Sequence, residues 1–399
     1  MSHQPARSVA DLQAEINELD ARYEIDKIIG HGSYGVVMRG KDKLDNNRLV
    51  AIKRVNKEIF DEMILAKRIL REIKLLAHFH DDNIIGLRNI LTPKTPNFHA
   101  FFIVMDIMDT DLKAVLRSGQ KLSESHIQFF IYQALRALKV IHHAGVVHRD
   151  ITPANILVNT NCDLKICDFG LAKEENDEGQ DMTDYVTMRW YRAPELVMED
   201  KKYDGKIDVW GIGAILGELF GSKPLCQGKD RVNQLDKIID VVGKPSEDEI
   251  KSLGSAAAQK YLMKKSDRPS VDWKAKYPAV SDLGLDLLKK MMTFDPKRRI
   301  GVDEAMRHPY LASLYDEADE KVDVKKFDFN EHIHKTVDDV KKAIYEESIG
   351  FHIRHPSSAP GATGKAKPAA GVDAGGSEGA APAGAIEKRE VDGGKFEDH

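Results

Sequence analysis

Two short segments of the chain carry residue types and spacings suited to chemistry. Residues 30–37 form a glycine loop between two strand patterns, and glycine permits backbone N–H groups to approach phosphate oxygens closely. Residues 148–155 place a carboxylate, Asp150, and an amide, Asn155, five residues apart, directly after a long apolar helix pattern. Glycine loops also bind dinucleotides, but a dinucleotide loop leads into a helix, whereas this one leads into a strand. The strand context therefore separates this loop from the dinucleotide-binding type.

Further charged residues follow in a defined order. Lys53 ends an apolar strand run, and Glu72 lies on the helical pattern that interrupts the strands. Residues 168–170 (Asp-Phe-Gly) come thirteen residues after Asn155, and residues 193–195 are Ala-Pro-Glu. Lys and Glu are usually solvated surface charges, but here an apolar strand and an apolar helix face direct both toward one cleft. The set of motifs resembles that of the protein kinases.

This resemblance implies roles for the residues. Lys53 would hold the α- and β-phosphates of ATP, with Glu72 as its ion-pair partner. Asp150 would accept the proton of the substrate hydroxyl, and Asn155 and Asp168 would bind Mg²⁺. Neighbouring histidines do not suggest a metal site, since no cysteine or carboxylate completes a ligand set. His148 is instead expected to be buried and to brace the catalytic loop.

The resemblance also outlines an ATP site. The backbone of the hinge, at Asp106 and Met108, would pair with adenine, and Met105 would be the gatekeeper that narrows the rear pocket. Cys167 would face the cleft, and a small buried hydrophobe is the alternative for it. Leu157 would form the floor of the site and Asp111 would reach the ribose. The residues expected to contact ATP are Ile29, Gly30, His31, Gly32, Ser33, Tyr34, Gly35, Val36, Val37, Lys53, Asp106, Met108, Asp111 and Leu157.

Two positions near Asp150 depart from the kinase pattern. Thr152 stands where serine/threonine kinases carry a lysine that contacts the γ-phosphate and the catalytic aspartate, and Met188 stands where relatives carry a threonine. Either the Thr152 hydroxyl substitutes for the missing one, which predicts an active enzyme with lowered kcat and retained ATP binding, or the chain is a weakly active, scaffold-like homologue that acts by phosphorylation-dependent binding. The intact set of Lys53, Glu72, Asp150, Asn155 and Asp168 favours the enzyme.

Thr183-Asp184-Tyr185 resembles the dual-phosphorylation lip of the mitogen-activated protein (MAP) kinases, and the middle aspartate is typical of plant and protist members. The resemblance runs from about residue 23 to 349 and includes an inserted segment near 243–277 and an extension from 311 to 349. Cyclin-dependent kinases lack both the lip and the extension. The resemblance implies a proline-directed serine/threonine kinase that is activated by phosphorylation of Thr183 and Tyr185.

Phosphates on the lip need cationic partners, because each adds about −1.5 to −2 charge and three acceptor oxygens. The segment before the lip is acidic, so we expect the lip to be poorly ordered until cations clamp its phosphates. The candidate anchors are Arg68, Arg71, Arg149 and Lys173 for the threonine phosphate, and Arg189 and Arg192 for the tyrosine phosphate.

Residues 315–320 resemble the acidic docking patch of this family, with Asp316, Asp319 and Glu320 as the candidate docking residues. An acidic helix end on the surface is the alternative. The implied partners are an upstream dual-specificity MAP kinase kinase, phosphatases and substrates with basic docking motifs, and proteins with Ser/Thr-Pro sites. We expect a monomer.

Composition bounds the class of protein. The 399 residues are 42% hydrophobic, enough for large buried cores, and the net charge of −5 favours neither nucleic acid nor a membrane surface as partner. No apolar run reaches the length of a membrane span, and the first seven residues lack the apolar stretch of a secretory signal. Three cysteines are too few for a disulfide framework. We therefore expect a cytoplasmic protein, with a nuclear pool left open.

The elements that position these residues follow from apolar periodicity. Short strand runs fill residues 23–104 and helical patterns dominate afterwards, which predicts an α+β fold with the β-rich small lobe and helical large lobe of the protein kinases. Capping boxes predict helices that begin near Ser8 and Thr336, and the apolar run 207–220 predicts a buried helix. The expected divisions are an N-terminal extension (1–22), a kinase domain (23–311), a wrap-around extension (312–354) and a disordered tail rich in Gly, Ala and Pro (355–399).

Overall fold

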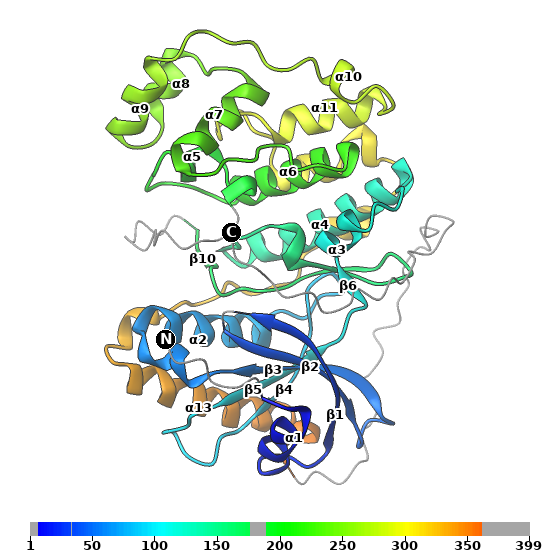
Figure 1. The fold of residues 1–399 in the computed structure, drawn as a ribbon, viewed down its shortest axis with the longest axis vertical. Helices are drawn as coiled ribbons and strands as arrows, with labels where there is room; N and C mark the ends of the chain where they lie inside the picture. The colour runs from blue at the N-terminus through cyan, green and yellow to red at the C-terminus, as the bar shows by residue number, and fades with distance from the viewer. Residues whose placement is uncertain (1–6, 33, 176–188, 361–399) are drawn as a thin grey trace. The chain divides into compact units, whose positions relative to one another are not determined.

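The computed structural model describes residues 7–32, 34–175 and 189–360, and it has the predicted α+β architecture of a β-rich and a helical unit (Figure 1). The first unit contains residues 7–108, 168–171 and 327–360. The second contains residues 109–167, 172–175 and 189–326. Each unit has its own secondary structure and supplies part of the predicted site.

An antiparallel sheet with the strand order β1-β2-β3-β5-β4 is the centre of the first unit. Apolar residues line the inner face of the middle strands, and Met38, Ile52 and Val104 are fully buried. β1 and β2 form a hairpin whose turn is the glycine loop. The strands are β1 (Tyr23–Gly32), β2 (Gly35–Asp42), β3 (Arg48–Val55), β4 (Leu87–Leu91) and β5 (Phe101–Asp106).

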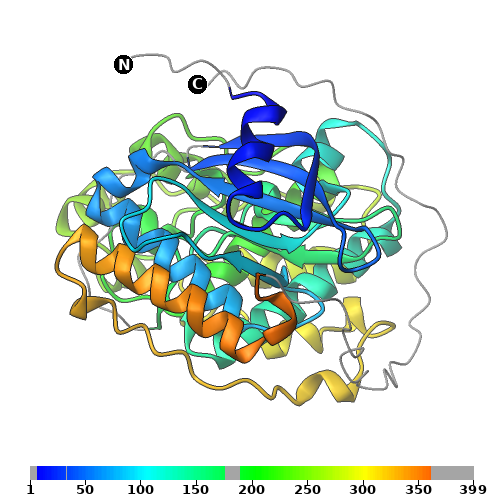
Figure 2. The ribbon, with the colours of Figure 1, turned by 90° about the horizontal axis from the view of Figure 1, so that it is seen from below.

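Helix α2 (Met63–His78) packs against α13 (Val337–Arg354), and the two run side by side in Figures 1 and 2. Val340, Ile344 and Phe351 of α13 enter the same apolar core as Ile69 and Ile73 of α2. As predicted, Thr336 caps α13 in a capping box with Asp339. The C-terminal extension is therefore part of the structure that holds α2 in place.

The N-terminal helix α1 (Val9–Asn17) begins at the predicted Ser8–Asp11 capping box. Its fully buried Leu12 and Ile16 join the sheet residues in one core, and Figure 2 shows α1 lying across the strands. Glu15 pairs with Arg54 of β3 at 2.6 Å. The helix packs on the main domain as predicted, although it shares the core of the first unit rather than forming a separate extension.

The predicted boundaries after residue 311 need two corrections. Residues 312–326 belong to the second unit and residues 327–360 to the first, so the extension is not one continuous unit. The tail also begins later than residue 355, because Pro356–Ser358 forms a 3-10 turn (η7). The buried Arg22 side chain donates to the carbonyl oxygens of Ser357 and Ser358 at 3.2 and 3.0 Å. Residues 361–399 lie outside the described residues.

The second unit is mainly helical. Ser123 caps α4 in a capping box, and α6 is buried along nearly its whole length, as its apolar run predicts. Short strands beside α4 carry the catalytic loop: β6 (Thr110–Asp111), β7 (Val146–Val147), β8 (Ile156–Val158), β9 (Leu164–Ile166) and β10 (Lys173–Glu174). The helices are α3 (Leu112–Arg117), α4 (Glu124–His143), α5 (Pro194–Val197), α6 (Lys206–Gly221), α7 (Arg231–Val242), α8 (Glu247–Ser252), α9 (Ala256–Met263), α10 (Trp273–Lys276), α11 (Asp282–Met291) and α12 (Val302–Met306).

Across the described ranges, none of the helices has both the length and the apolar character that a membrane crossing requires.

Candidate active site

Lys53 and Glu72, predicted as an ion pair, lie together in the first unit. Lys53 Nζ is 2.6 Å from Glu72 Oε1 and 2.8 Å from Oε2, so one ammonium bridges both carboxylate oxygens. The side chains are 13% and 5% exposed. Burial raises the pKa of Glu72, while the charge of Lys53 opposes that rise and the negative charge of Asp168 adds to it. The pair holds the lysine ammonium over β3, where it can meet a phosphate.

The glycine loop closes between β1 and β2. At Gly35, φ is +148°, and a Cβ there would lie 1.8 Å from the Arg54 carbonyl oxygen, so only glycine fits. Val37 pairs with Lys53 across β2 and β3, which puts the loop beside the lysine. Tyr34 accepts a hydrogen bond from Arg68 Nη1 at 3.1 Å, and its ring centroid is 5.7 Å from Lys53 Nζ. Ser33 lies outside the described residues.

The predicted gatekeeper Met105 and the predicted hinge residue Asp106 end β5 in the first unit. Asp106 Oδ1 accepts from Arg88 Nε at 2.5 Å, and its N–H donates to the Gly86 carbonyl at 2.9 Å. Met108 is the last residue of this stretch of the unit. These contacts fix the backbone at the end of β5, where adenine is expected to pair.

The other two predicted ATP residues, Asp111 and Leu157, belong to the second unit and pair with each other across β6 and β8. Asp111 begins α3, since its Oδ1 accepts from Ala114 N at 2.8 Å. Burial raises the pKa of this carboxyl group. The expected nucleotide residues are therefore divided between the two units.

The Asp168-Phe169-Gly170 segment lies with the first unit. Phe169 is fully buried against Phe79, with ring centroids 5.3 Å apart. Gly170 N donates to Asp168 Oδ1 at 3.2 Å, and Asp168 has a left-handed φ of +63°. Such backbone strain persists only where the surroundings over-determine it, and it is typical of functional sites.

Asp168 and Asn155, the predicted Mg²⁺ ligands, supply hard oxygen donors. Within the described ranges there is no cluster of three or more His, Cys, Asp or Glu side chains suited to a metal. Mg²⁺ is commonly held by only one or two carboxylates together with substrate phosphates and water. Each of the two residues offers a hard oxygen of the kind that Mg²⁺ takes beside substrate phosphates.

The catalytic loop of the second unit joins Asp150 directly to Asn155. Asn155 Nδ2 donates to both the Asp150 carbonyl oxygen and Asp150 Oδ2, each at 2.9 Å. Its amide oxygen is thus oriented away from the carboxylate. His148 is fully buried; its Nδ1 accepts from Asp150 N at 3.3 Å and its Nε2 lies 3.1 Å from the Cys167 carbonyl oxygen. The histidine braces the loop as predicted.

Asp208, which was not predicted as a site residue, holds the backbone of this loop. Located on α6 and 1% exposed, it accepts from the backbone N–H groups of His148 and Arg149 at 2.8 Å each, and its Oδ2 lies 2.9 Å from His142 Nε2. Burial alone would raise its pKa, but the His142 contact, the charges of both histidines and the His148 N–H bring the pKa below its usual value of 3.8. A carboxylate near the start of the apolar run 207–220 was the signal available in the sequence.

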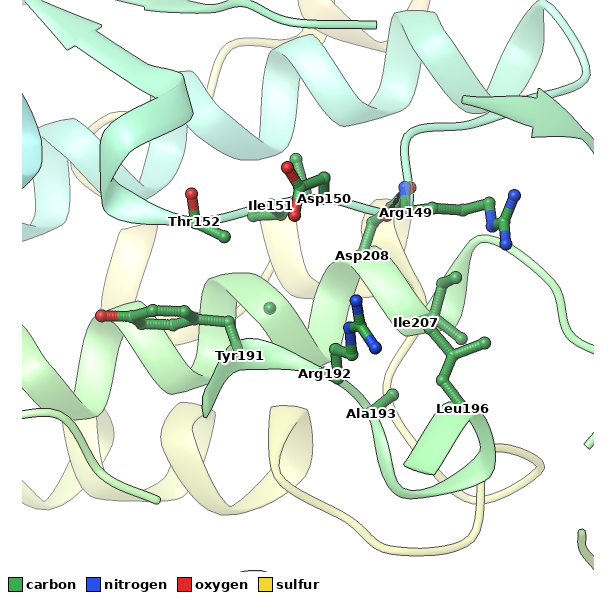
Figure 3. A pocket seen from close by; sticks show the side chains of 11 residues that line it. Arg149, Asp150, Ile151, Thr152, Tyr191, Arg192, Ala193, Leu196, Ile207 and Asp208 are labelled. Carbon is green, nitrogen blue, oxygen red and sulfur yellow. Dashed lines mark hydrogen bonds between the residues drawn. The ribbon is translucent and has the colours of Figure 1, made fainter. Parts of the chain in front are cut away.

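A pocket in the second unit extends from the catalytic loop to the segment after the lip. Figure 3 shows Arg149, Asp150 and Thr152 along the loop, facing Tyr191 and other residues of the returning segment. Thr152 is only 6% exposed. The remaining lining residues are Ile151, Arg192, Ala193, Leu196, Ile207, Asp208 and Gly211.

Glu195, in the Ala-Pro-Glu motif, forms a buried ion pair with Arg299, which the sequence did not single out. Arg299 Nη1 and Nη2 lie 2.7 and 2.8 Å from its two carboxylate oxygens. This bidentate pair fixes the chain that follows the lip. Thr183 and Tyr185, together with Met188, lie outside the described residues.

The predicted phosphate anchors occupy different surroundings. Arg71 is engaged by Glu331, with its Nε 2.5 Å from Oε1, and Arg68 by Tyr34. In the second unit the Arg149 guanidinium lies 5.5 Å from the Tyr203 ring centroid, and Lys173 is buried in β10. Arg189 Nη1 donates to the Lys229 carbonyl at 3.1 Å, and Arg192 lines the pocket.

The acidic patch at residues 316–320 is partly neutralised by neighbouring groups. Asp319 accepts from Tyr132 at 2.6 Å and pairs with Arg136 at 3.1 Å. Glu320 pairs with Lys139 at 3.0 Å and with Arg307, whose hydrogen bonds lower the Glu320 pKa. Asp316 accepts from Ala318 N at 2.8 Å at the start of a 3-10 turn, η5 (Glu317–Glu320).

Comparison with known proteins agrees with this geometry. Residues 23–311 match the family model of the protein kinase domain. The chain is 44% identical over 340 residues to extracellular signal-regulated kinase 1 of Dictyostelium discoideum, which aligns 84% of this chain but only 64% of that protein. It is 45% identical over 340 residues to mitogen-activated protein kinase 6 of Arabidopsis thaliana, covering 84% of this chain and 85% of the relative. It is 42% identical over 336 residues to mitogen-activated protein kinase 4 of rice, with coverages of 84% and 90%.

The fold and the matching domain define an ATP-dependent protein kinase. Its relatives narrow the class, and the chain belongs to the MAP kinase family of serine/threonine protein kinases, close to its plant and protist members. Membership implies ATP and a divalent metal for the reaction, and an upstream MAP kinase kinase and protein substrates as partners.

Proposed function

We propose that the chain is a proline-directed MAP kinase that transfers the γ-phosphate of ATP to Ser or Thr hydroxyls followed by proline. The observation that carries the proposal is the pocket beside Asp150, whose apolar side chains Ile151, Ala193 and Leu196 suit a proline ring. Proline has no N–H to satisfy, so contact with these apolar side chains does not penalise it as it would a residue with a buried donor.

Paired peptides that differ only in the residue after the acceptor test this preference. A Thr-Pro peptide should show kcat/KM at least about tenfold higher than the matched Thr-Ala peptide. Equal kcat/KM values for the two peptides would refute the preference for proline but would not bear on kinase activity itself.

The chain's own residues divide the work of phosphoryl transfer. Asp150, hydrogen-bonded to Asn155, accepts the proton of the substrate hydroxyl. Lys53, held by Glu72, binds the α- and β-phosphates. Asp168 and Asn155 would hold Mg²⁺, which would supply neutralising charge to the phosphates. Positioning and electrostatics account for most of catalysis in this chemistry, so an intact set of charged groups tolerates the change at Thr152.

Phosphorylation of Thr183 and Tyr185 is proposed to switch the enzyme on. Cations on both sides of the lip in the sequence support this: Arg149 and Lys173 precede it, and Arg189 and Arg192 follow it. Each phosphate would gain charge-assisted hydrogen bonds from them.

The combined variant Thr183→Ala with Tyr185→Phe should lose activation by an upstream kinase, measured as turnover alongside mass-spectrometric mapping of the lip. Thr95→Ala, at an exposed Thr-Pro dipeptide outside the lip, is the matched control and should activate normally. Full activation of the double variant would refute activation through phosphorylation of the lip.

The acidic residues Asp316, Asp319 and Glu320 are proposed to receive basic docking motifs of activators, phosphatases and substrates. Asp319 and Glu320 also hold Arg136, Arg307 and Lys139, so changing them would disturb internal contacts. Asp316→Lys tests the charge of the patch, with Tm measured alongside because Asp316 accepts from Ala318 N in η5. It should weaken binding of a basic docking peptide, while Asp323→Lys, a nearby carboxylate outside the docking set, should leave the peptide affinity unchanged.

A further inference from the structure

Arg71 is the point at which three segments of the first unit meet. Its Nε and Nη2 lie 2.5 and 2.6 Å from the two carboxylate oxygens of Glu331, in a 3-10 turn (η6, Glu331–Ile333). Its Nη1 donates to the Gly170 carbonyl oxygen at 2.9 Å. Arg71 is 9% exposed, and the Glu331 side chain is 20% exposed. Bidentate pairs of this kind fix the plane of the guanidinium as well as its position.

The Gly170 carbonyl belongs to the segment that carries Asp168. Phe169 anchors this segment in the core against Phe79, and Gly170 N donates to Asp168 Oδ1. Arg71 adds a third attachment, on the carbonyl side of Gly170. The direction of that hydrogen bond depends on the plane of the guanidinium, which Glu331 determines.

The same helix also positions the lysine. Glu72, the next residue of α2, holds Lys53, so successive residues of one helix hold the phosphate-binding lysine and the metal-binding segment. Glu331 lies outside the residues 23–311 that match the kinase domain and precedes α13, which packs on α2. The extension thus reaches the site through a charged contact in addition to its apolar packing.

We propose that Glu331 is a positioning residue for the metal-dependent step of ATP binding. By orienting Arg71 it holds Asp168-Phe169-Gly170 where Asp168 can share a divalent metal with the ATP phosphates. This inference rests on the proposed assignment of Asp168 as a metal ligand. Outer partners of metal ligands commonly contribute strongly to metal affinity because they orient the ligands.

The test measures how much Mg²⁺ strengthens ATP binding to the full chain. All variants carry Thr183→Ala and Tyr185→Phe, so that no lip phosphate competes for Arg71. The affinity for ATP is measured by calorimetry with Mg²⁺ and with a chelator, and the ratio of the two dissociation constants is the readout. Glu331→Gln keeps the shape of the side chain but removes its charge, and Glu331→Asp keeps the charge.

Glu331→Gln should reduce the Mg²⁺-dependent gain about tenfold, at the low end of the range for outer partners, with metal-free affinity changed by less than about twofold. Glu331→Asp should restore most of the gain. Glu346→Gln, an exposed carboxylate on α13, is the matched control and should behave as the unaltered background.

Two results would overturn the inference, and a third would also contradict the proposed role of Asp168 as a metal ligand. A Glu331→Gln ratio equal to that of the control, while Asp168→Asn loses the gain, removes the role of Glu331 alone. An equal loss of affinity with and without Mg²⁺, accompanied by a lower Tm, assigns Glu331 to folding only. If Asp168→Asn keeps the full gain, the metal assignment under the proposed function fails as well.

Discussion

Lys53 of the first unit and Asp150 of the second are positioned by different means. In the first unit, Lys53, Glu72, Arg71 and Glu331 are placed by ion pairs between side chains. In the second, Asp150 lies on a loop whose backbone N–H groups donate to the buried Asp208, and whose Asn155 donates to Asp150 itself. One region depends on pairs of opposite charge, and the other on hydrogen bonds to the main chain.

This difference explains which departures from the kinase pattern the molecule can accept. Asp208 accepts a hydrogen bond from the backbone of the catalytic loop, and Asn155 and His148 form hydrogen bonds with Asp150 inside the loop. The geometry of the loop therefore does not depend on the residue at position 152. Lys53 and Glu72 depend on each other directly, because one ammonium bridges both oxygens of the carboxylate. The departure at Thr152 falls on this hydrogen-bonded loop, and Met188 lies outside the described residues.

The largest expected effect comes from removing the support of the catalytic loop. Asp208→Asn should lower kcat about 100-fold, because the loop shifts, and destabilise the fold by about 2–4 kcal/mol, because buried N–H groups lose a charged acceptor. Activity and thermal unfolding measure both. Asp230→Asn, an exposed helix cap, should change neither by a comparable amount.

Acid should remove the contribution of the Asp208 carboxylate to stability. The folded pKa of Asp208 lies below its ordinary value of 3.8, so its contribution to stability is complete above that pH and is lost as the pH falls through the folded pKa. Unfolding free energies of the parent and of Asp208→Asn should therefore converge in strong acid. A difference that persists unchanged there would contradict the role of the carboxylate charge.

Breaking the pair in the first unit should have the next largest effect. Glu72→Gln leaves the largely buried Lys53 without its counter-charge and should reduce kcat/KM about tenfold, with a rise in the KM for ATP. The separate values of kcat and of the KM for ATP are the readout, because Lys53 is assigned to phosphate binding. An unchanged KM for ATP would argue that the pair does not position Lys53 for the nucleotide. Glu62→Gln, at the start of α2, controls for a change on the same helix.

Shortening the chain separates the structured end from the tail. A chain that ends at Pro360 should keep its Tm and activity. A chain that ends at Arg354 removes the carbonyl acceptors of the buried Arg22 and should lose about 1–3 kcal/mol of stability. Equal Tm values for the two truncations would show that the Arg22 contacts do not matter.

Restoring the kinase pattern at the two departures should have the smallest effect. Thr152→Lys combined with Met188→Thr should raise kcat only about two- to fivefold, because the other charged groups already carry the phosphate charge. Thr95→Lys supplies the control for an added charge elsewhere. A gain of about 100-fold would mean that the loop is well supported in the wrong geometry, and the comparison between the two regions would then fail.

Much of this organisation could be predicted from the sequence because local patterns determine it. The capping boxes at Ser8 and Thr336 begin helices as expected, and the glycine loop lies between two strands. The Lys53–Glu72 pair could be predicted because an apolar strand and an apolar helix face determine which way each side chain points.

The contacts that escaped prediction join residues far apart in the chain. Arg71 meets Glu331 across 260 positions, and Glu195 meets Arg299 across 104. A charged residue in a sequence does not reveal a distant partner, since surface exposure is its usual fate. Asp208 left a weak signal as a carboxylate in an apolar helix, whereas Glu331 left none.

We propose that the catalytic loop around Asp150 supports an active, lip-regulated kinase despite Thr152. The most direct measurement is turnover of the full chain, phosphorylated on Thr183 and Tyr185 as verified by mass spectrometry, on a Thr-Pro peptide with Asp150→Asn as the blank. We expect turnover clearly above the blank, and we expect this turnover to fall when the lip is dephosphorylated. Turnover equal to that of Asp150→Asn would contradict it and favour a binding role.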